Sequence, residues 1–211
     1  MINYIIYLGY VFSGINLILY LKRCRKEDKA FRIFTLYLFV IALIQFFTSL
    51  LKNKGINNLF LSHFYFVLQL ILLSFFYLTI LEMKIQRRIV RTCLMGCLFV
   101  LGVQYLSDKQ LFLKFNLFEI FITSYLLILY SMFHFYNLLN KEKNYYYINT
   151  GILIYLFGST VLFISGNLIN TLKLESRNIV WLLNAFLIVV YQLFIFIEWR
   201  IRARRNTEDY E

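Results

Sequence analysis

Residues 58–81 read NLFLSHFYFVLQLILLSFFYLTIL, a stretch without a single Lys, Arg, Asp or Glu. As an α-helix, a segment of about 20 apolar residues crosses the hydrocarbon core of a bilayer, which is about 30 Å thick. A membrane β-strand would alternate polar and apolar side chains, and residues 68–73, LQLILL, do not alternate. This stretch therefore predicts a transmembrane helix.

Six further stretches have a similar length and the same apolar character. The chain of 211 residues is 61% hydrophobic with a mean hydropathy of +0.67, which is unusual for a soluble domain. Because the loops are short, consecutive helices are expected to pack as antiparallel neighbours. We predict an all-α fold, a seven-transmembrane-helix bundle over residues 1–199, followed by a short tail over 200–211. The other six stretches are Asn3–Leu21, Phe31–Leu51, Ile89–Leu106, Leu111–Asn137, Tyr147–Asn170 and Ile179–Trp199.

Lys and Arg residues are distributed unevenly between the loops, and the positive-inside rule converts this into an orientation. With the N-terminus outside and the C-terminus in the cytoplasm, sixteen of the 22 basic residues lie on the cytoplasmic side. The fourth stretch is the weakest, with Arg91, Thr92 and Gln104 near its ends, and if it did not cross, that number would fall to fourteen. No basic residue precedes the first stretch, so we expect it to be retained and not cleaved as a signal peptide. The pattern predicts a multi-pass protein of the inner (cytoplasmic) membrane.

The tail begins with a cluster of basic residues, namely Arg200, Arg202, Arg204 and Arg205. One interpretation is a topology anchor attracted to the anionic headgroups of the lipid bilayer. The other is a docking segment for a cytoplasmic signalling partner. The net charge of +11 does not indicate nucleic-acid binding here, because the cations lie at the ends of the apolar stretches.

Glu119 is the only acidic residue well inside a predicted span. An ionisable side chain at the bilayer centre costs about 2.5–3.5 kcal/mol on insertion scales, so such residues are candidates for functional sites. We place Glu119 about two turns below the outer end of the fifth helix. At about 100° per residue it shares a face with Asn116, Thr123, Tyr130 and His134, which predicts an inward-facing polar stripe.

Polar side chains of four other helices are expected at a similar depth. We hypothesise a polar, ligand-binding pocket that is open to the outside and is centred on one carboxylate and one imidazole. The alternative is that the same residues only hold the helices together, through interhelical hydrogen bonds worth about 0.6 kcal/mol each. The pocket residues are Glu119, His63, Asn116, Gln45, Asn167 and Asn184.

The sixth stretch carries Gly151, Gly158 and Ser165 at seven-residue intervals. Small residues on one stripe allow a neighbouring helix to approach closely. The chain contains no proline, whereas many transporters interrupt their helices with Pro or Gly around the substrate site. The sequence therefore favours unbroken helices in close contact.

Residue patterns typical of catalysis are missing from the sequence. Two His and no Asp within a span do not supply the ligands of a membrane metallohydrolase. No phosphate-binding or kinase motif is present. Cys93 and Cys97, one turn apart, are interpreted as packing residues, with a metal or redox pair as the alternative. We expect a protein without enzyme activity, metal or cofactor.

Two runs, 58–77 and 149–167, resemble the third and sixth helices of a largely uncharacterised family of small seven-helix integral membrane proteins common in the Bacteroidetes. Asn116, Glu119 and Trp181 are similar to the same pattern. Many members of that family carry Glu at the position of Gln69. Some members are encoded near histidine kinases, so the resemblance implies a role in signalling.

Three functions follow as hypotheses. The first is a non-enzymatic membrane sensor or regulatory subunit that binds a ligand near Glu119 and His63 and acts on a cytoplasmic partner. The second is a small transporter or channel subunit in which the Glu119 stripe lines a path. The third is a membrane accessory or regulator of a bacterial defence locus with an RNA-targeting CRISPR effector. Gene neighbourhood would discriminate the first and third, and flux measurements would test the second.

Overall fold

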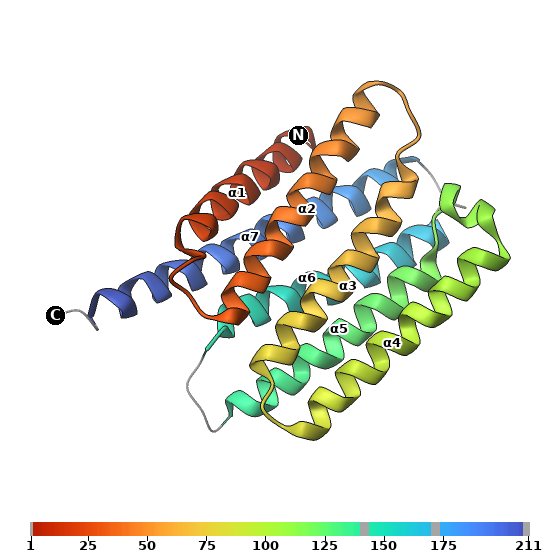
Figure 1. The fold of residues 1–211 in the computed structure, drawn as a ribbon. Coiled ribbons are helices and arrows are strands. Elements are labelled where there is room, and N and C mark those ends of the chain that lie inside the picture. The colour runs from red at the N-terminus through yellow and green to blue at the C-terminus, as the bar shows by residue number, and fades with distance from the viewer. Residues whose placement is uncertain (1, 140–143, 170–173, 209–211) are drawn as a thin grey trace. The chain divides into compact units, whose positions relative to one another are not determined.

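The computed structural model describes residues 2–139, 144–169 and 174–208, and side chains over 4–139, 144–165 and 179–204. Within these ranges the chain is helical throughout, apart from short connections, and contains no strand. The all-α prediction is confirmed (Figure 1). The elements are α1 (Ile2–Arg23), α2 (Lys29–Asn53), α3 (Leu59–Ile80), α4 (Lys84–Ser107), the 3₁₀ helix η1 (Lys109–Leu113), α5 (Leu117–Leu138), α6 (Tyr146–Ile169) and α7 (Leu174–Glu208).

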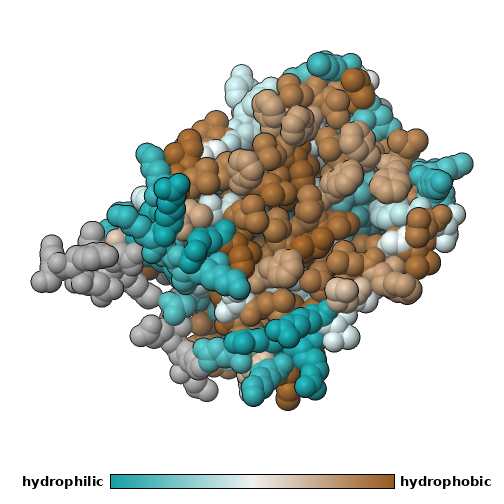
Figure 2. All heavy atoms as spheres, viewed as in Figure 1, coloured by the Kyte–Doolittle hydropathy of each residue, from teal (hydrophilic) through white to brown (hydrophobic). Residues whose placement is uncertain are grey.

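Seven helices in the described part of the chain are long and apolar enough to cross a membrane. The fourth, the span that the sequence supports least, is among them. Large apolar side chains such as Phe47 and Phe186 are more than half exposed, as expected when lipid is the solvent. Brown, hydrophobic atoms cover the middle of the face seen in Figure 2. The chain is thus a multi-pass membrane protein.

The prediction for the fifth stretch was wrong at its start. Residues 111–116 do not belong to a long helix: η1 ends at Leu113, and α5 begins only at Leu117. Asn116 explains the break, because its side-chain oxygen accepts a hydrogen bond from the Glu119 backbone N–H (3.3 Å) and so caps the new helix. Glu119 therefore lies in the first turn of α5, not two turns below its end.

The chain divides into two compact units. The first combines Met1–Arg23 with Phe135–Glu211 and holds α1, α6 and α7. In it, α1 and α7 run parallel, because Asn16 pairs with Gln192 and Tyr20, one turn further on, donates to the Ile195 carbonyl (3.0 Å). The Asn16 amide donates to both the backbone and the side-chain oxygen of Gln192, each at 2.8 Å.

Two glycines allow α6 to lie directly against α7. A Cβ at Gly151 would lie 2.8 Å from the Cβ of Phe194, and one at Gly158 would lie 2.7 Å from Cδ1 of Leu187. The glycine stripe thus permits the close approach that its spacing predicts. At the other end of the pair, Glu198 of α7 accepts backbone N–H groups of the residues that begin α6.

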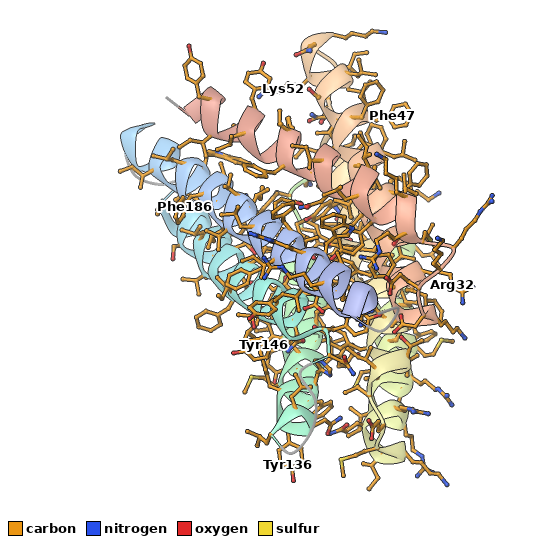
Figure 3. All side chains as sticks on the ribbon, turned by 90° about the vertical axis from the view of Figure 1, so that its left-hand side faces the viewer. Arg32, Phe47, Lys52, Tyr136, Tyr146 and Phe186 are labelled. Carbon is orange, nitrogen blue, oxygen red and sulfur yellow. The ribbon has the colours of Figure 1, made fainter. Side chains whose placement is uncertain are left out.

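The second unit, Cys24–His134, holds α2, α3, α4, η1 and most of α5. The core between α2 and α3 is aromatic, with the rings of Phe34 and Phe76 5.4 Å apart. Tyr130 of α5 joins the unit by packing against Tyr77 of α3 and by donating to the Val90 carbonyl of α4 (3.4 Å). In Figure 3, Arg32 and Lys52 lie at opposite ends of α2, as expected for a spanning helix with charged ends.

Candidate ligand-binding site

Glu119 has no solvent exposure although it lies only one turn inside α5. Its backbone carbonyl accepts the hydroxyl of Thr123 (2.8 Å), and its backbone N–H is capped by Asn116. The local sequence thus anchors the start of α5 and directs this carboxylate into the second unit. A carboxylate in such surroundings requires hydrogen-bond partners, because an unpaired buried charge is strongly disfavoured.

Side chains from α3 and α4 both contact one carboxylate oxygen of Glu119, which lies on α5. Nδ1 of His63, on α3, lies 2.6 Å from Oε2 of Glu119. The hydroxyl of Tyr105, on α4, donates to the same Oε2 at 2.7 Å. The Tyr105 oxygen and His63 Nδ1 are themselves 2.8 Å apart, so the three polar atoms form a closed triangle. We call these three residues the Glu119 cluster.

The distances in the Glu119 cluster fit an ionised carboxylate that accepts two hydrogen bonds at Oε2. An ionised carboxylate only accepts hydrogen bonds, so the imidazole contributes Nδ1–H and the phenol contributes its O–H. With Nδ1 protonated, a neutral His63 presents an unshared electron pair at Nε2.

Two polar atoms of the Glu119 cluster have no hydrogen-bond partner among the described residues. They are Oε1 of Glu119 and Nε2 of His63, and both are fully buried. Leaving a buried polar atom unpaired costs about 1–3 kcal/mol. The described residues therefore leave part of the hydrogen-bonding capacity of the cluster unused.

A second layer of side chains surrounds the cluster on the side of η1. The Asn116 amide donates to Gln104 Oε1 (3.2 Å) and to the Tyr105 oxygen (3.3 Å). Phe112 of η1 packs against Tyr105, with ring centres 4.6 Å apart, and meets His63 edge-on at 5.9 Å. Phe112 is exposed and Tyr105 is partly exposed, so the cluster reaches the surface through Tyr105, whereas Glu119 and His63 are buried.

The structure brings together three of the six residues predicted for the pocket: His63, Asn116 and Glu119. Gln45 is half-buried on α2 and forms no hydrogen bond with the cluster within the described residues. Asn184 belongs to the first unit and lines a different pocket. The side chain of Asn167 lies outside the described residues.

Tyr105, Gln104 and Phe112 belong to the site but were not predicted for it. A tyrosine near the end of a span is typical of the interfacial aromatic belt, so the position of Tyr105 in the sequence does not by itself indicate a polar site. The sequence analysis did not place Phe112 at the site, because it predicted residues 111–116 as part of a long helix, whereas Phe112 lies in η1. The polar stripe of α5 does face inward: Thr123, Tyr130 and His134 are all buried.

Among the described residues, no group of three or more His, Cys, Asp or Glu is arranged to hold a metal ion. Cys93 and Cys97 are free thiols. Comparison with protein-family models, with curated proteins and with solved structures returned no match.

Proposed function

We propose that the protein is a non-enzymatic membrane sensor or regulatory subunit, which binds a small ligand at the Glu119 cluster and acts on a cytoplasmic partner. One observation carries this proposal: the cluster leaves Glu119 Oε1 and His63 Nε2 buried without hydrogen-bond partners among the described residues. A cluster that served only to hold helices together would pair these atoms, since each unpaired atom opposes folding.

The chemistry of the free atoms favours a particular class of ligand. Both are acceptors when His63 is neutral, and the cluster as a whole carries one negative charge. A small cation with N–H donors complements both properties, because hydrogen bonds to charged groups contribute about 1.5–3 kcal/mol each. We therefore propose a primary amine, in its ammonium form, as the ligand class.

The proposed orientation has the N-terminus outside and the C-terminus in the cytoplasm of a cell with an inner membrane. The charge distribution supports this orientation. It puts the Glu119 cluster near the outer surface. It also puts the basic end of α7, which continues as a helix to Glu208, on the cytoplasmic side. Arg200 and Arg204 are exposed there and are the proposed contact for the partner. The resemblance to seven-helix proteins encoded near histidine kinases favours a signalling partner.

The experiment measures the thermal unfolding of the purified protein in detergent micelles with and without propylammonium. We expect this probe to raise the Tm of the wild-type protein, because a ligand that binds only the folded state stabilises it. The Glu119→Gln variant keeps the side-chain shape but loses the charge. We expect it to remain folded and to bind the probe at least about tenfold more weakly.

Two controls separate binding at the cluster from general effects. 1-Propanol has the same chain without the charge, and should leave the Tm unchanged at the same concentration. Thr150→Val removes a hydroxyl that, among the described residues, bonds to the Tyr146 backbone carbonyl within α6, and should leave the effect of propylammonium intact. An equal Tm shift in wild type and Glu119→Gln would refute the site. If wild-type protein carried propylammonium into proteoliposomes and Glu119→Gln abolished this flux, the protein would be a transporter and not a sensor.

A further inference from the structure

A pocket of about 130 Å³ lies between the first halves of α1 and α7, within the first unit. Ile5, Ile6 and Ile188 line its walls, and Tyr10 and Trp181 lie at its edge with exposed rings. Both helices are long and apolar enough to span the membrane, and all the lining residues lie within these two spans. Apolar cavities of about 150 Å³ admit a molecule of the size of benzene, so this pocket accommodates part of a hydrocarbon chain.

One polar group interrupts the apolar lining. Asn184 is 8% exposed, and its side-chain Oδ1 is buried without a hydrogen-bond partner among the described residues. An amide oxygen accepts hydrogen bonds, so the missing partner is a donor. No charged side chain lines the pocket within the described part of the chain, which favours a neutral donor over an ammonium group.

The room in the pocket depends on a glycine of α1. A Cβ at Gly9 would lie 3.3 Å from Cγ2 of Ile188 and 3.8 Å from Cγ2 of Val189. Any larger side chain at this position would enter the space between the two helices. Gly14, further along α1, provides a matched control, because a Cβ there would have no described atom within 4 Å.

We propose that this pocket binds a membrane-borne amphiphile with a hydrocarbon chain and a hydroxyl end, which donates a hydrogen bond to Asn184. The apolar walls contact the hydrocarbon chain. Tyr10 and Trp181 are aromatic residues of the kind found at the boundary between polar and apolar surroundings, and the Asn184 amide oxygen accepts the hydrogen bond of the hydroxyl. Ester-linked phospholipid chains present only acceptors near the chain and so leave Asn184 Oδ1 unpaired. The site lies apart from the Glu119 cluster in sequence and requires no amine binding.

Trp181 provides a direct readout, because bromine atoms on a bound chain quench its fluorescence. The chain has two Trp residues, and Trp199→Phe leaves Trp181 as the only fluorophore of this type. The protein is placed in phosphatidylcholine vesicles and titrated with 10,11-dibromoundecan-1-ol or with its methyl ether, which lacks the O–H. We expect saturable quenching by the alcohol and about three- to tenfold weaker binding of the ether, the difference made by one hydrogen bond.

Two variants in the same background test the two parts of the site. Asn184→Leu removes the amide at similar size, and should abolish the preference for the alcohol while the chain still binds. Gly9→Leu fills the pocket and should remove saturable quenching, whereas Gly14→Leu should retain it. Far-ultraviolet circular dichroism confirms that each variant is helical, and Asn184→Leu decides the test if Gly9→Leu does not fold.

Three outcomes would overturn the proposal. Equal binding of alcohol and ether by the wild-type pocket would remove the role of the hydroxyl. Saturable quenching that survives in Gly9→Leu would place the amphiphile elsewhere. Saturable quenching by dibrominated phosphatidylcholine, as strong as that by the alcohol and lost in Gly9→Leu, would identify an ordinary phospholipid chain as the occupant.

Discussion

At the scale of single residues, Glu119 shows how one carboxylate is accommodated inside a membrane span. Its Oε2 receives hydrogen bonds from His63 and Tyr105, which distribute the charge over three side chains. Its Oε1 receives none among the described residues. This asymmetry supports the proposed binding role, because most buried polar atoms in folded proteins have a hydrogen-bond partner.

Removing the hydroxyl of Tyr105 tests how strongly the cluster stabilises the fold. Tyr105→Phe keeps the ring that packs against Phe112 but loses the hydrogen bond to Glu119. We expect the free energy of unfolding to fall by about 1.5–3 kcal/mol, the range for a hydrogen bond to a charged group. Unfolding by sodium dodecyl sulfate in mixed micelles measures it.

The matched control is Tyr125→Phe on α5, whose ring is 53% exposed and stacks on Phe121. It should change the free energy of unfolding by less than about 0.5 kcal/mol, as is usual for surface substitutions. Equal effects of the two substitutions would show that the Tyr105 hydroxyl contributes nothing specific.

At the scale of elements, helix ends and helix contacts decide which side chains meet. Asn116 caps α5 and, through its amide, also contacts Tyr105. The same residue therefore ends the η1 connection and positions the Glu119 cluster. On α6, Gly151 and Gly158 have no side chain, and this allows α7 to pack closely against α6.

The two glycines of α6 should differ in their tolerance of alanine. At Gly151 the new methyl group meets Phe194 Cβ, which is attached to the backbone and cannot rotate away. At Gly158 it meets the end of Leu187, which can change rotamer. We expect Gly151→Ala to destabilise the protein by about 1–3 kcal/mol, and Gly158→Ala by less.

Gly96→Ala on α4 is the reference, because a Cβ there has no described atom within 4 Å. The helix propensity of alanine should leave this variant as stable as wild type, or more stable by up to about 1 kcal/mol. Sodium dodecyl sulfate titration ranks the three variants. A smaller loss for Gly151→Ala than for Gly158→Ala would contradict the packing described for α6 and α7.

At the scale of the whole molecule, the parallel contact of α1 with α7 bears on topology. Hydrogen bonds join Asn16 to Gln192 and Tyr20 to Ile195, so both helices cross the membrane in the same direction. The start of α1 and the end of α7 then lie on opposite sides. An odd number of crossings, such as seven, requires the two ends of the chain to lie on opposite sides of the membrane. The proposed orientation further states that the N-terminal end is outside.

Reporter fusions after Arg205 test that orientation. We expect alkaline phosphatase fused there to be inactive and green fluorescent protein to fluoresce, because the positive-inside rule keeps the arginine cluster in the cytoplasm. A fusion after Lys54, between α2 and α3, should show the opposite pattern. Phosphatase activity at the Arg205 fusion would reverse the proposed direction of signalling.

The sequence by itself determined the seven spans and the all-α fold. Partition into lipid is nearly a sum over residues, so runs such as 58–81 identify helices without knowledge of their neighbours. It also singled out Glu119 and His63, because ionisable groups in a span are rare and costly. The sequence did not predict where the fifth helix starts, because that depends on whether the Asn116 side chain caps the backbone N–H of Glu119.

Only the tertiary structure decided which polar groups share a site. Asn184 and Glu119 are both polar residues in the first third of their helices, yet they belong to different units, and Asn184 lines its own pocket. Tyr105 joined the Glu119 cluster because the rotation of α4 directs its hydroxyl inward. Depth along a helix can be counted from the sequence, but rotation about the helix axis and choice of neighbour come from packing, which is a property of pairs of helices.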